Sequence, residues 1–330
     1  MLSLAKSAFR AAAIRLLRPW YRGVGCIICL HRVIPEEYRS PLAANRALEI
    51  TPETLRDLLA WTAKRGLEAI TLDEASSRLS TPQRGQKWVV WTLDDGYRDN
   101  LVHALPVFRE HGVPCTVYVT PGLVTGRDPA WWYALERALL HAGTPETRVP
   151  DRKFEVLASE VRSLSPEARN PWIQQRCEAA GLDPLAITQK LMLTLSELRE
   201  LAADPLVTIG AHSGSHHALA MLDEAAARAE LAVGRQDLID ILGKPVDHLA
   251  YPFGGGTTVG EREFSIARDL GFSTATTTRT ANIFARHAQH LHALPRLTIS
   301  GNFDGVRLLQ TLESGAGTAR AFRGRRFVTA

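Results

Sequence analysis

Two short polar segments of the sequence carry residues that could together bind a metal ion. Asp94 and Asp95 are adjacent, and neighbouring carboxylates repel each other unless a cation or a shared proton intervenes. His212 and His216 are four residues apart, so both imidazoles turn to one side if the backbone makes one helical turn. Two imidazole nitrogens and one carboxylate oxygen suit zinc or a similar divalent ion and leave coordination positions for water and substrate. Such a set is typical of a hydrolase.

Each segment alone has an ordinary interpretation. Adjacent aspartates also occur in solvated turns, and two histidines at this spacing are more often structural or exposed than metal-binding. Here, however, both segments follow apolar, strand-like runs, over residues 88–93 and 207–210. Enzymes built from alternating strands and helices place reacting groups at the C-terminal ends of their strands. The positions of the two segments therefore favour one shared active site.

With their neighbours included, the same segments resemble a known family. Residues 92–97 (TLDDGY) resemble the T-F-D-D-G motif of the polysaccharide deacetylases of the NodB-homology type, also called carbohydrate esterase family 4. Residues 212–216 (HSGSH) fit the H-[ST]-x-x-H motif of that family. Residues 249–254 (LAYPFG) resemble its third motif, and residues 31–33 (HRV) resemble the opening of many bacterial members. The resemblance extends over most of the chain and implies a distorted (β/α) barrel.

The resemblance also implies roles for individual residues. The implied ligands of a divalent metal, with Zn²⁺ as the expected ion, are Asp95, His212 and His216. The implied general base is Asp94, which takes a proton from the attacking water. The implied substrate and oxyanion contacts are Tyr251, Phe253 and Gly254, with a backbone N–H near Phe253 facing the oxyanion.

Two positions depart from the family pattern. Many members carry an arginine in the third motif that orients the base, whereas this chain has Ala250 there. Many members also supply a histidine acid within a Leu-x-His pattern, whereas residues 294–296 read Leu-Pro-Arg. His31 is the first candidate for the missing acid, because it follows the first strand and should reach the same rim. His290 and His292 are the alternatives, and all three could instead be ordinary polar residues near a cleft.

The elements that must position these residues alternate between strands and helices, which indicates a mainly parallel sheet or barrel with helices outside. The predicted strands cover residues 24–30, 67–72, 88–93, 115–120, 206–210, 247–251, 272–276 and 293–299. The helix over residues 52–64 begins after Thr51 as N-cap, with proline at its first position. Another helix begins after Thr194, whose spacing to Glu197 is that of a capping box.

A mostly helical stretch over residues 128–190 interrupts this alternation and is interpreted as an insertion that forms a lid or a substrate wall. Trp131, Trp132 and Tyr133 are consecutive within it, so at least one should be exposed or cap a groove. They could form an aromatic platform for a sugar, although core packing of two of them is the simpler interpretation. The predicted organisation is a helix over 1–22, a deacetylase barrel domain over 23–314 and a basic flexible tail over 315–330.

The composition excludes several other classes of protein. Apolar residues make up 45% of the chain and charged residues 22%, which are globular values. The formal charge of +4 is modest, and no basic patch interleaved with aromatic residues indicates nucleic acid as a partner. Four cysteines do not make a disulfide scaffold in a chain of this length. Cys26 and Cys29 have C-x-x-C spacing but lie in an apolar run, so a buried strand is favoured over a redox or metal role.

The N-terminal segment over residues 1–22 combines basic and apolar residues in the pattern of an amphipathic helix. It could contact an anionic membrane peripherally or pack across one end of the domain. Charges interrupt it too often for the core of a signal peptide, and no run is long enough to span a bilayer. The expected location is therefore the cytoplasm, with peripheral contact at the inner membrane as one interpretation.

These observations predict a metal-dependent hydrolase that removes N-acetyl groups from amino sugars of an oligosaccharide, polysaccharide or lipid-linked glycan. Some bacterial members involved in exopolysaccharide maturation look similar at the position of the histidine acid, so this departure does not by itself mean loss of activity. Two alternatives remain at this stage. One is a deformylase or other deacylase of a lipid-linked amino sugar. The other is a non-catalytic glycan-binding protein of the same fold, for which the absent arginine and histidine argue.

Overall fold

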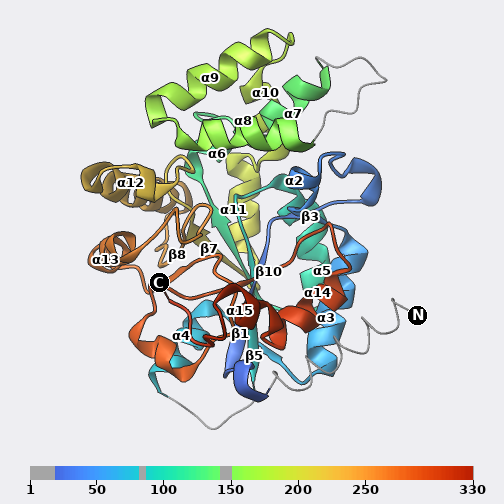
Figure 1. Cartoon of the computed structure of the whole chain (residues 1–330), viewed down its shortest axis with the longest axis vertical. Coiled ribbons are helices and arrows are strands. Elements are labelled where there is room, and N and C mark those ends of the chain that lie inside the picture. Colours follow the sequence, from blue (N-terminus) through green and yellow to red (C-terminus); the bar gives the residue numbers. More distant parts are fainter. Residues whose placement is uncertain (1–18, 82–86, 142–150, 330) are drawn as a thin grey trace.

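The barrel is built around a parallel sheet whose strands are buried on both faces. The structure, a computed structural model, describes residues 19–81, 87–141 and 151–329. The strands that define the sheet follow the order β10 (Leu297–Thr298), β1 (Gly25–Leu30), β5 (Trp88–Leu93), β6 (Cys115–Val119), β7 (Val207–Ala211), β8 (His248–Ala250) and β9 (Thr274–Thr276), and β4 (Glu68–Ala69) pairs with β5. Continuous apolar runs suit a parallel sheet that is covered on both faces by helices. Figure 1 shows these helices around the sheet.

The sheet curls into the distorted barrel that the sequence predicts. An isolated parallel bridge between Thr276 and Leu294 links β9 to the segment before β10. Several rim strands are shorter than expected, and those predicted over 67–72 and 293–299 contain only two residues each. The first is short because Thr71 accepts a hydrogen bond from the Glu74 amide and starts a helix.

The helices outside the barrel begin where the capping signals place them. Thr51 caps α3 (Pro52–Lys64), and Thr194 forms a capping box with Glu197 at the start of α11 (Leu195–Ala203). The other helices of the barrel are α4 (Leu72–Ser80), α5 (Leu105–His111), α6 (Pro121–Val124), α12 (Glu224–Leu242), α13 (Glu261–Asp269) and α14 (Gly305–Glu313). A π-helix, η2 (Asn100–Ala104), precedes α5. Short elements beside the site are β2 (Arg32–Val33), α2 (Ala43–Arg46) and β3 (Glu49–Ile50).

The predicted insertion forms a separate helical lobe above the barrel (Figure 1). It consists of α7 (Trp131–His141), α8 (Asp151–Ser163), α9 (Pro166–Glu178) and α10 (Pro184–Leu191). None of the three consecutive aromatic residues is exposed, since Trp131, Trp132 and Tyr133 are all buried, but Trp131 and Trp132 line the cavity described below, which fits the expectation that at least one caps a groove. They are buried because α7 packs against α8, α9 and α10 on one side and faces the barrel on the other. The Trp132 indole donates to Tyr97 Oη, and the Tyr133 hydroxyl donates to Glu49.

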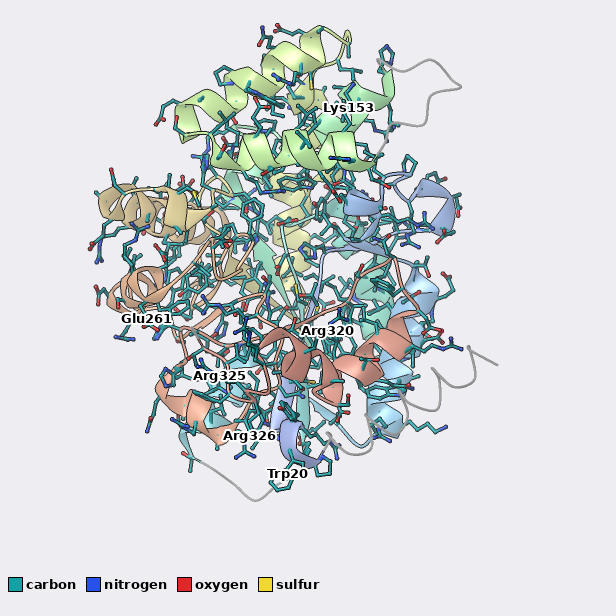
Figure 2. The ribbon with its side chains drawn as sticks, viewed as in Figure 1. Trp20, Lys153, Glu261, Arg320, Arg325 and Arg326 are labelled. Carbon is teal, nitrogen blue, oxygen red and sulfur yellow. The ribbon has the colours of Figure 1, made fainter. Side chains whose placement is uncertain are left out.

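Trp20, Arg325 and Arg326 lie on the side of the barrel away from the insertion (Figure 2). The predicted N-terminal helix lies mostly outside the described residues, which begin with a helical turn over residues 19–21. The C-terminal residues, expected to be flexible, instead form α15 (Ala316–Ala321) and place Val328 in the core. Within the described ranges, no helix is long and apolar enough to cross a membrane.

Candidate metal and deacetylation site

The predicted site residues come together at the C-terminal edge of neighbouring strands. β1 leads into His31, β5 leads into Asp94 and Asp95, and β7 leads into the loop that carries His212 and His216. β1 pairs with β5, and β6 lies between β5 and β7. Because parallel strands end at one edge, residues more than 100 positions apart in the sequence meet there.

Asp95, His212 and His216 form a buried set of three donor atoms. The Nε2 atoms of His212 and His216 lie 3.3 and 3.2 Å from Asp95 Oδ1. His212 Nδ1 lies 2.7 Å from the Ala250 carbonyl oxygen, so Nδ1 carries a proton and Nε2 faces Asp95. Asp95 Oδ1 is buried and has no hydrogen-bond partner in the structure. Electron-rich atoms that face one another in this way fit a divalent cation between them.

The ionisation of these groups is strongly coupled. Burial raises the pKa of Asp95, but the close approach of His212 and His216 outweighs burial and holds that pKa well below its usual range. Burial lowers the pKa of His212, yet the neighbouring aspartates bring it above the ordinary histidine value. Burial lowers the pKa of His216, and the opposing effect of Asp95 is too small to offset it, so this pKa lies below the ordinary histidine value. Asp95 is therefore an anionic donor at neutral pH.

The backbone at the site has left-handed conformations that non-glycine residues rarely adopt. The φ angles are 78° at Asp95, 59° at Ser213, 59° at His216 and 62° at Phe253. The two histidines therefore project from a bent loop, not from the helical turn that their spacing suggests. Each such conformation costs on the order of 1–3 kcal/mol and persists only when the surroundings enforce it.

Two side chains from different elements hold this histidine loop. Glu230 on α12 accepts hydrogen bonds from the amides of Gly214 and Ser215 and from the Ser215 hydroxyl. Arg169 on α9 of the insertion is buried and donates to the carbonyl oxygens of Ser215 and His216, at 2.9 and 3.2 Å. Neither residue is evident from the sequence, because charged residues are common on surface helices. The insertion thus takes part in positioning a metal ligand.

Asp94 lies beside this set and is paired with an arginine that the sequence analysis missed. Arg296 donates to both carboxylate oxygens of Asp94 at 2.7 Å, and both side chains are buried. The interpretation that Ala250 marks a missing arginine is therefore wrong, since Arg296 reaches the base from the segment before β10. Burial raises the pKa of Asp94, but the charge of Arg296, assisted by His212, lowers it below the usual aspartate range. Asp94 is therefore ionised.

Of the three candidate acids, only His31 lies in the site. His31 Nε2 lies 4.0 Å from Asp94 Oδ2, and His31 lines the same cavity. His292 Nε2 instead lies 2.7 Å from the Phe272 carbonyl oxygen, and His290 packs against the ring of Phe327. Neither of these two lines the cavity.

The C-x-x-C pair is buried in β1 and unpaired, as expected from the apolar run. Cys29 Sγ nevertheless lies 3.6 Å from Asp94 Oδ2 and donates a weak hydrogen bond to it. Burial raises the pKa of the Cys29 thiol, so it stays protonated and is a poor metal ligand.

The third motif is only partly at the site. The Phe253 ring lies 4.9 Å from the His216 ring, centroid to centroid, and Phe253 lines the cavity. Tyr251 is fully buried in the core and donates its hydroxyl to the His292 carbonyl oxygen, so the expectation that it contacts substrate is wrong. Gly254 is also absent from the cavity wall. Glycine is needed at position 254 for two reasons. The φ angle is 62°, and a Cβ would lie only 2.6 Å from the Thr278 amide nitrogen.

A cavity of about 220 Å³ lies over these groups, between the barrel and the insertion. Its catalytic side consists of His31, Asp94, Asp95, His212 and His216. Its other walls are Ala44, Asn45, Leu48, Trp131, Trp132, Phe154, Arg162, Phe253 and Thr278. A largely apolar cavity with a few convergent polar groups is typical of a small-ligand site.

The family described as polysaccharide deacetylase matches residues 81–275, which is more than half of the chain. The chain belongs to the polysaccharide deacetylase family. A protein of Bacillus subtilis (strain 168), YxkH, which is assigned to the polysaccharide deacetylases by its name, is 28% identical over 79 residues, which span 24% of this chain and 28% of that protein. The family match confirms the resemblance and the expected enzyme class, carbohydrate N-deacetylase, at the level of the family.

Solved structures support the fold of this family member. The deacetylase PplD of Streptococcus pyogenes, solved in complex with acetate, has a TM-score of 0.59 at 19% identity, covering 87% of this chain and 97% of that one. IcaB from Ammonifex degensii has a TM-score of 0.55 at 18% identity, covering 88% and 97%. The de-N-acetylase from Aggregatibacter actinomycetemcomitans has a TM-score of 0.57 at 12% identity, covering 87% and 99%. The predicted (β/α) barrel is confirmed by these neighbours.

Proposed function

We propose that this deacetylase is a metal-dependent hydrolase that removes N-acetyl groups from amino sugars of an oligosaccharide, polysaccharide or lipid-linked glycan. The observation that carries the proposal is the buried set of Asp95, His212 and His216 beside the ionised Asp94. The donor atoms of the set lie within 4.8 Å of one another. Two nitrogens and one oxygen favour Zn²⁺ as the ion.

Asp94, His31 and Phe253 have different roles in the proposed hydrolysis. A bound cation supplies Lewis-acid polarisation of the amide carbonyl and acidifies water. Asp94, oriented by Arg296, accepts the proton of the water whose oxygen bonds to the carbonyl carbon. The C–N bond then breaks, and His31 donates the proton that the leaving amine needs. The Phe253 amide is the proposed donor to the oxyanion.

The cavity supports an amino sugar as substrate. The aromatic walls of Trp131, Trp132 and Phe253 suit the apolar face of a sugar ring. The acetate in the Streptococcus pyogenes structure is the acid that hydrolysis of an N-acetyl group releases. Pairing of Arg296 with Asp94 removes the argument for a non-catalytic protein that rested on an absent arginine.

The test combines metal content with acid release. Purified protein is analysed for bound Zn²⁺, and acetate and formate are quantified after incubation with N-acetylated and N-formylated hexosamine glycans. Asp94→Asn should retain the metal and lose at least about 100-fold in acetate release, because general-base catalysis contributes at least that much. Formate release alone would assign a deformylase. Metal-loaded wild-type protein that releases neither acid would contradict an enzyme and favour glycan binding.

A further inference from the structure

One face of helix α8 lines the cavity, and Arg162 lies at the C-terminal end of this face. Phe154, Ala158 and Arg162 recur every four residues, so they share a face of the helix. Phe154 and Ala158 are buried, whereas Arg162 is exposed at the rim. Phe154 and Arg162 both line the cavity, and a separation of eight residues places their backbones about 12 Å apart along the axis.

Arg162 has no protein partner within the described parts of the chain. No carboxylate lies within ion-pair distance of its guanidinium, and no hydrogen bond of its side chain is found. Two other arginines of the insertion are engaged, because Arg169 donates to backbone carbonyls and Arg176 stacks on Trp172. Partial burial lowers the pKa of Arg162, and no acidic group offsets this effect.

The other charges of the cavity are already compensated. Asp94 is paired with Arg296, and Asp95 faces the two metal-binding histidines. The remaining walls near α8 and α2 include the apolar Ala44 and Leu48, and the amide of the polar Asn45 is already bonded to the Trp132 carbonyl oxygen and Glu136. A guanidinium at the edge of such a surface presents a planar set of donors that matches a carboxylate or a phosphate.

We propose that Arg162 binds an oxyanion carried by the amino-sugar substrate and thereby gives this deacetylase a preference for anionic over neutral glycans. The inference rests on the proposed function, since it places the acylated nitrogen at the metal side of the cavity. The cavity is smaller than the roughly 300–1,000 Å³ of typical ligand sites, so it favours one sugar unit with its anionic group at the rim. The oxyanion is a phosphate ester on the sugar or a carboxylate of the sugar ring.

The experiment compares matched substrates in wild type and in Arg162→Gln. The substrates are a neutral N-acetylglucosamine oligomer, N-acetylglucosamine 1-phosphate and an N-acetylhexosaminuronic acid. Arg162→Gln should lower kcat/KM for an anionic substrate about 10-fold or more, mainly through KM, because a hydrogen bond to a charged group is lost. The value for the neutral oligomer should stay within about twofold. The anionic substrate that responds identifies the source of the oxyanion.

Arg152→Gln provides the matched control, because Arg152 is an exposed arginine of the same helix that does not line the cavity. It should change neither kcat/KM value. Equal losses on neutral and anionic substrates in Arg162→Gln, or no loss on either anionic substrate, would overturn the inference. Calorimetric binding of glucosamine 1-phosphate against glucosamine gives a second readout that needs no turnover. The same measurement is made with the deacetylated hexosaminuronic acid. Loss of the preference for an anionic product in Arg162→Gln supports the inference even if the proposed reaction fails, and no preference in wild type for either of the two anionic products over glucosamine contradicts it.

Discussion

Replacement of Arg296 by methionine should strongly destabilise the protein. Arg296 is 0% exposed and Asp94 is 1% exposed, and two hydrogen bonds of 2.7 Å join them. Arg296 also donates to Thr92 Oγ1 and to the Thr277 carbonyl oxygen, each at 3.0 Å. Removal of the guanidinium leaves a buried carboxylate without its counter-charge. The free energy of unfolding should fall by about 3–5 kcal/mol, the usual cost of breaking a buried ion pair.

Urea unfolding in the presence of a chelator measures this loss without a contribution from metal binding. The comparison needs wild type, Arg296→Met, Asp94→Leu and the double variant. The double variant has no uncompensated charge, so it should be more stable than Arg296→Met alone. If the two single losses simply add in the double variant, the two side chains are not coupled and the assignment of Arg296 to Asp94 fails.

The same substitution should move the acidic limb of the pH–rate profile. Asp94 acts as an anion, so activity is present above its pKa and is lost as pH falls through it. Arg296 holds that pKa below the usual aspartate range, and burial alone would raise it. In Arg296→Met the limb should therefore shift to higher pH, whereas Arg296→Lys, which keeps a positive charge, should shift it less. An unchanged limb in both variants would show that Asp94 does not set it.

Two further predictions concern parts of the chain outside the catalytic centre. Arg169→Met should weaken the affinity for Zn²⁺ about 10-fold or more, because groups that orient metal ligands have effects of this size. Competition with a chromophoric chelator measures this affinity. Arg176→Met, on the same helix, should leave the affinity unchanged. Burial lowers the pKa of His287 in the folded protein to about 4, whereas in the unfolded chain the pKa of this side chain has its ordinary value of 6.5. Between pH 4 and pH 6.5 the unfolded chain therefore binds more protons than the folded protein. The stability that His287 contributes is complete above pH 6.5 and is lost as pH falls through 4, about 3 kcal/mol in all. Urea midpoints should follow this pH dependence in wild type and less steeply in His287→Asn, and equal slopes would contradict it.

Local signals predicted the helices of this fold better than its rim strands. The caps at Thr51 and Thr194 act within one turn of chain, so the sequence contains the whole interaction. The two-residue strand β10 depends on pairing with β1, which is more than 250 residues away, and its length cannot be judged from its own residues. The same reasoning applies to α7, whose three aromatic residues became buried only because other helices of the insertion cover one of its sides and the barrel covers the other.

The residues of the candidate site also differ in how well the sequence predicts them. Asp94, Asp95, His212 and His216 could be predicted because each lies in a short motif after an apolar run. Arg296 was missed because its partner is 202 residues away in the sequence. A signal was present, since an arginine inside an apolar segment is almost never buried without a partner. The supports at Arg169 and Glu230 carry no such signal.

The distance between Asp94 and Arg296 has a consequence for biosynthesis. A ribosome releases β5 with its aspartates long before it has added the arginine that neutralises one of them, because 202 residues separate the two. Until then the sheet has a carboxylate at its C-terminal edge that favours water over burial. The nascent barrel therefore cannot reach its final packing co-translationally from the N-terminal half alone. The last strand completes both the architecture and the electrostatic balance of the interior in one late step.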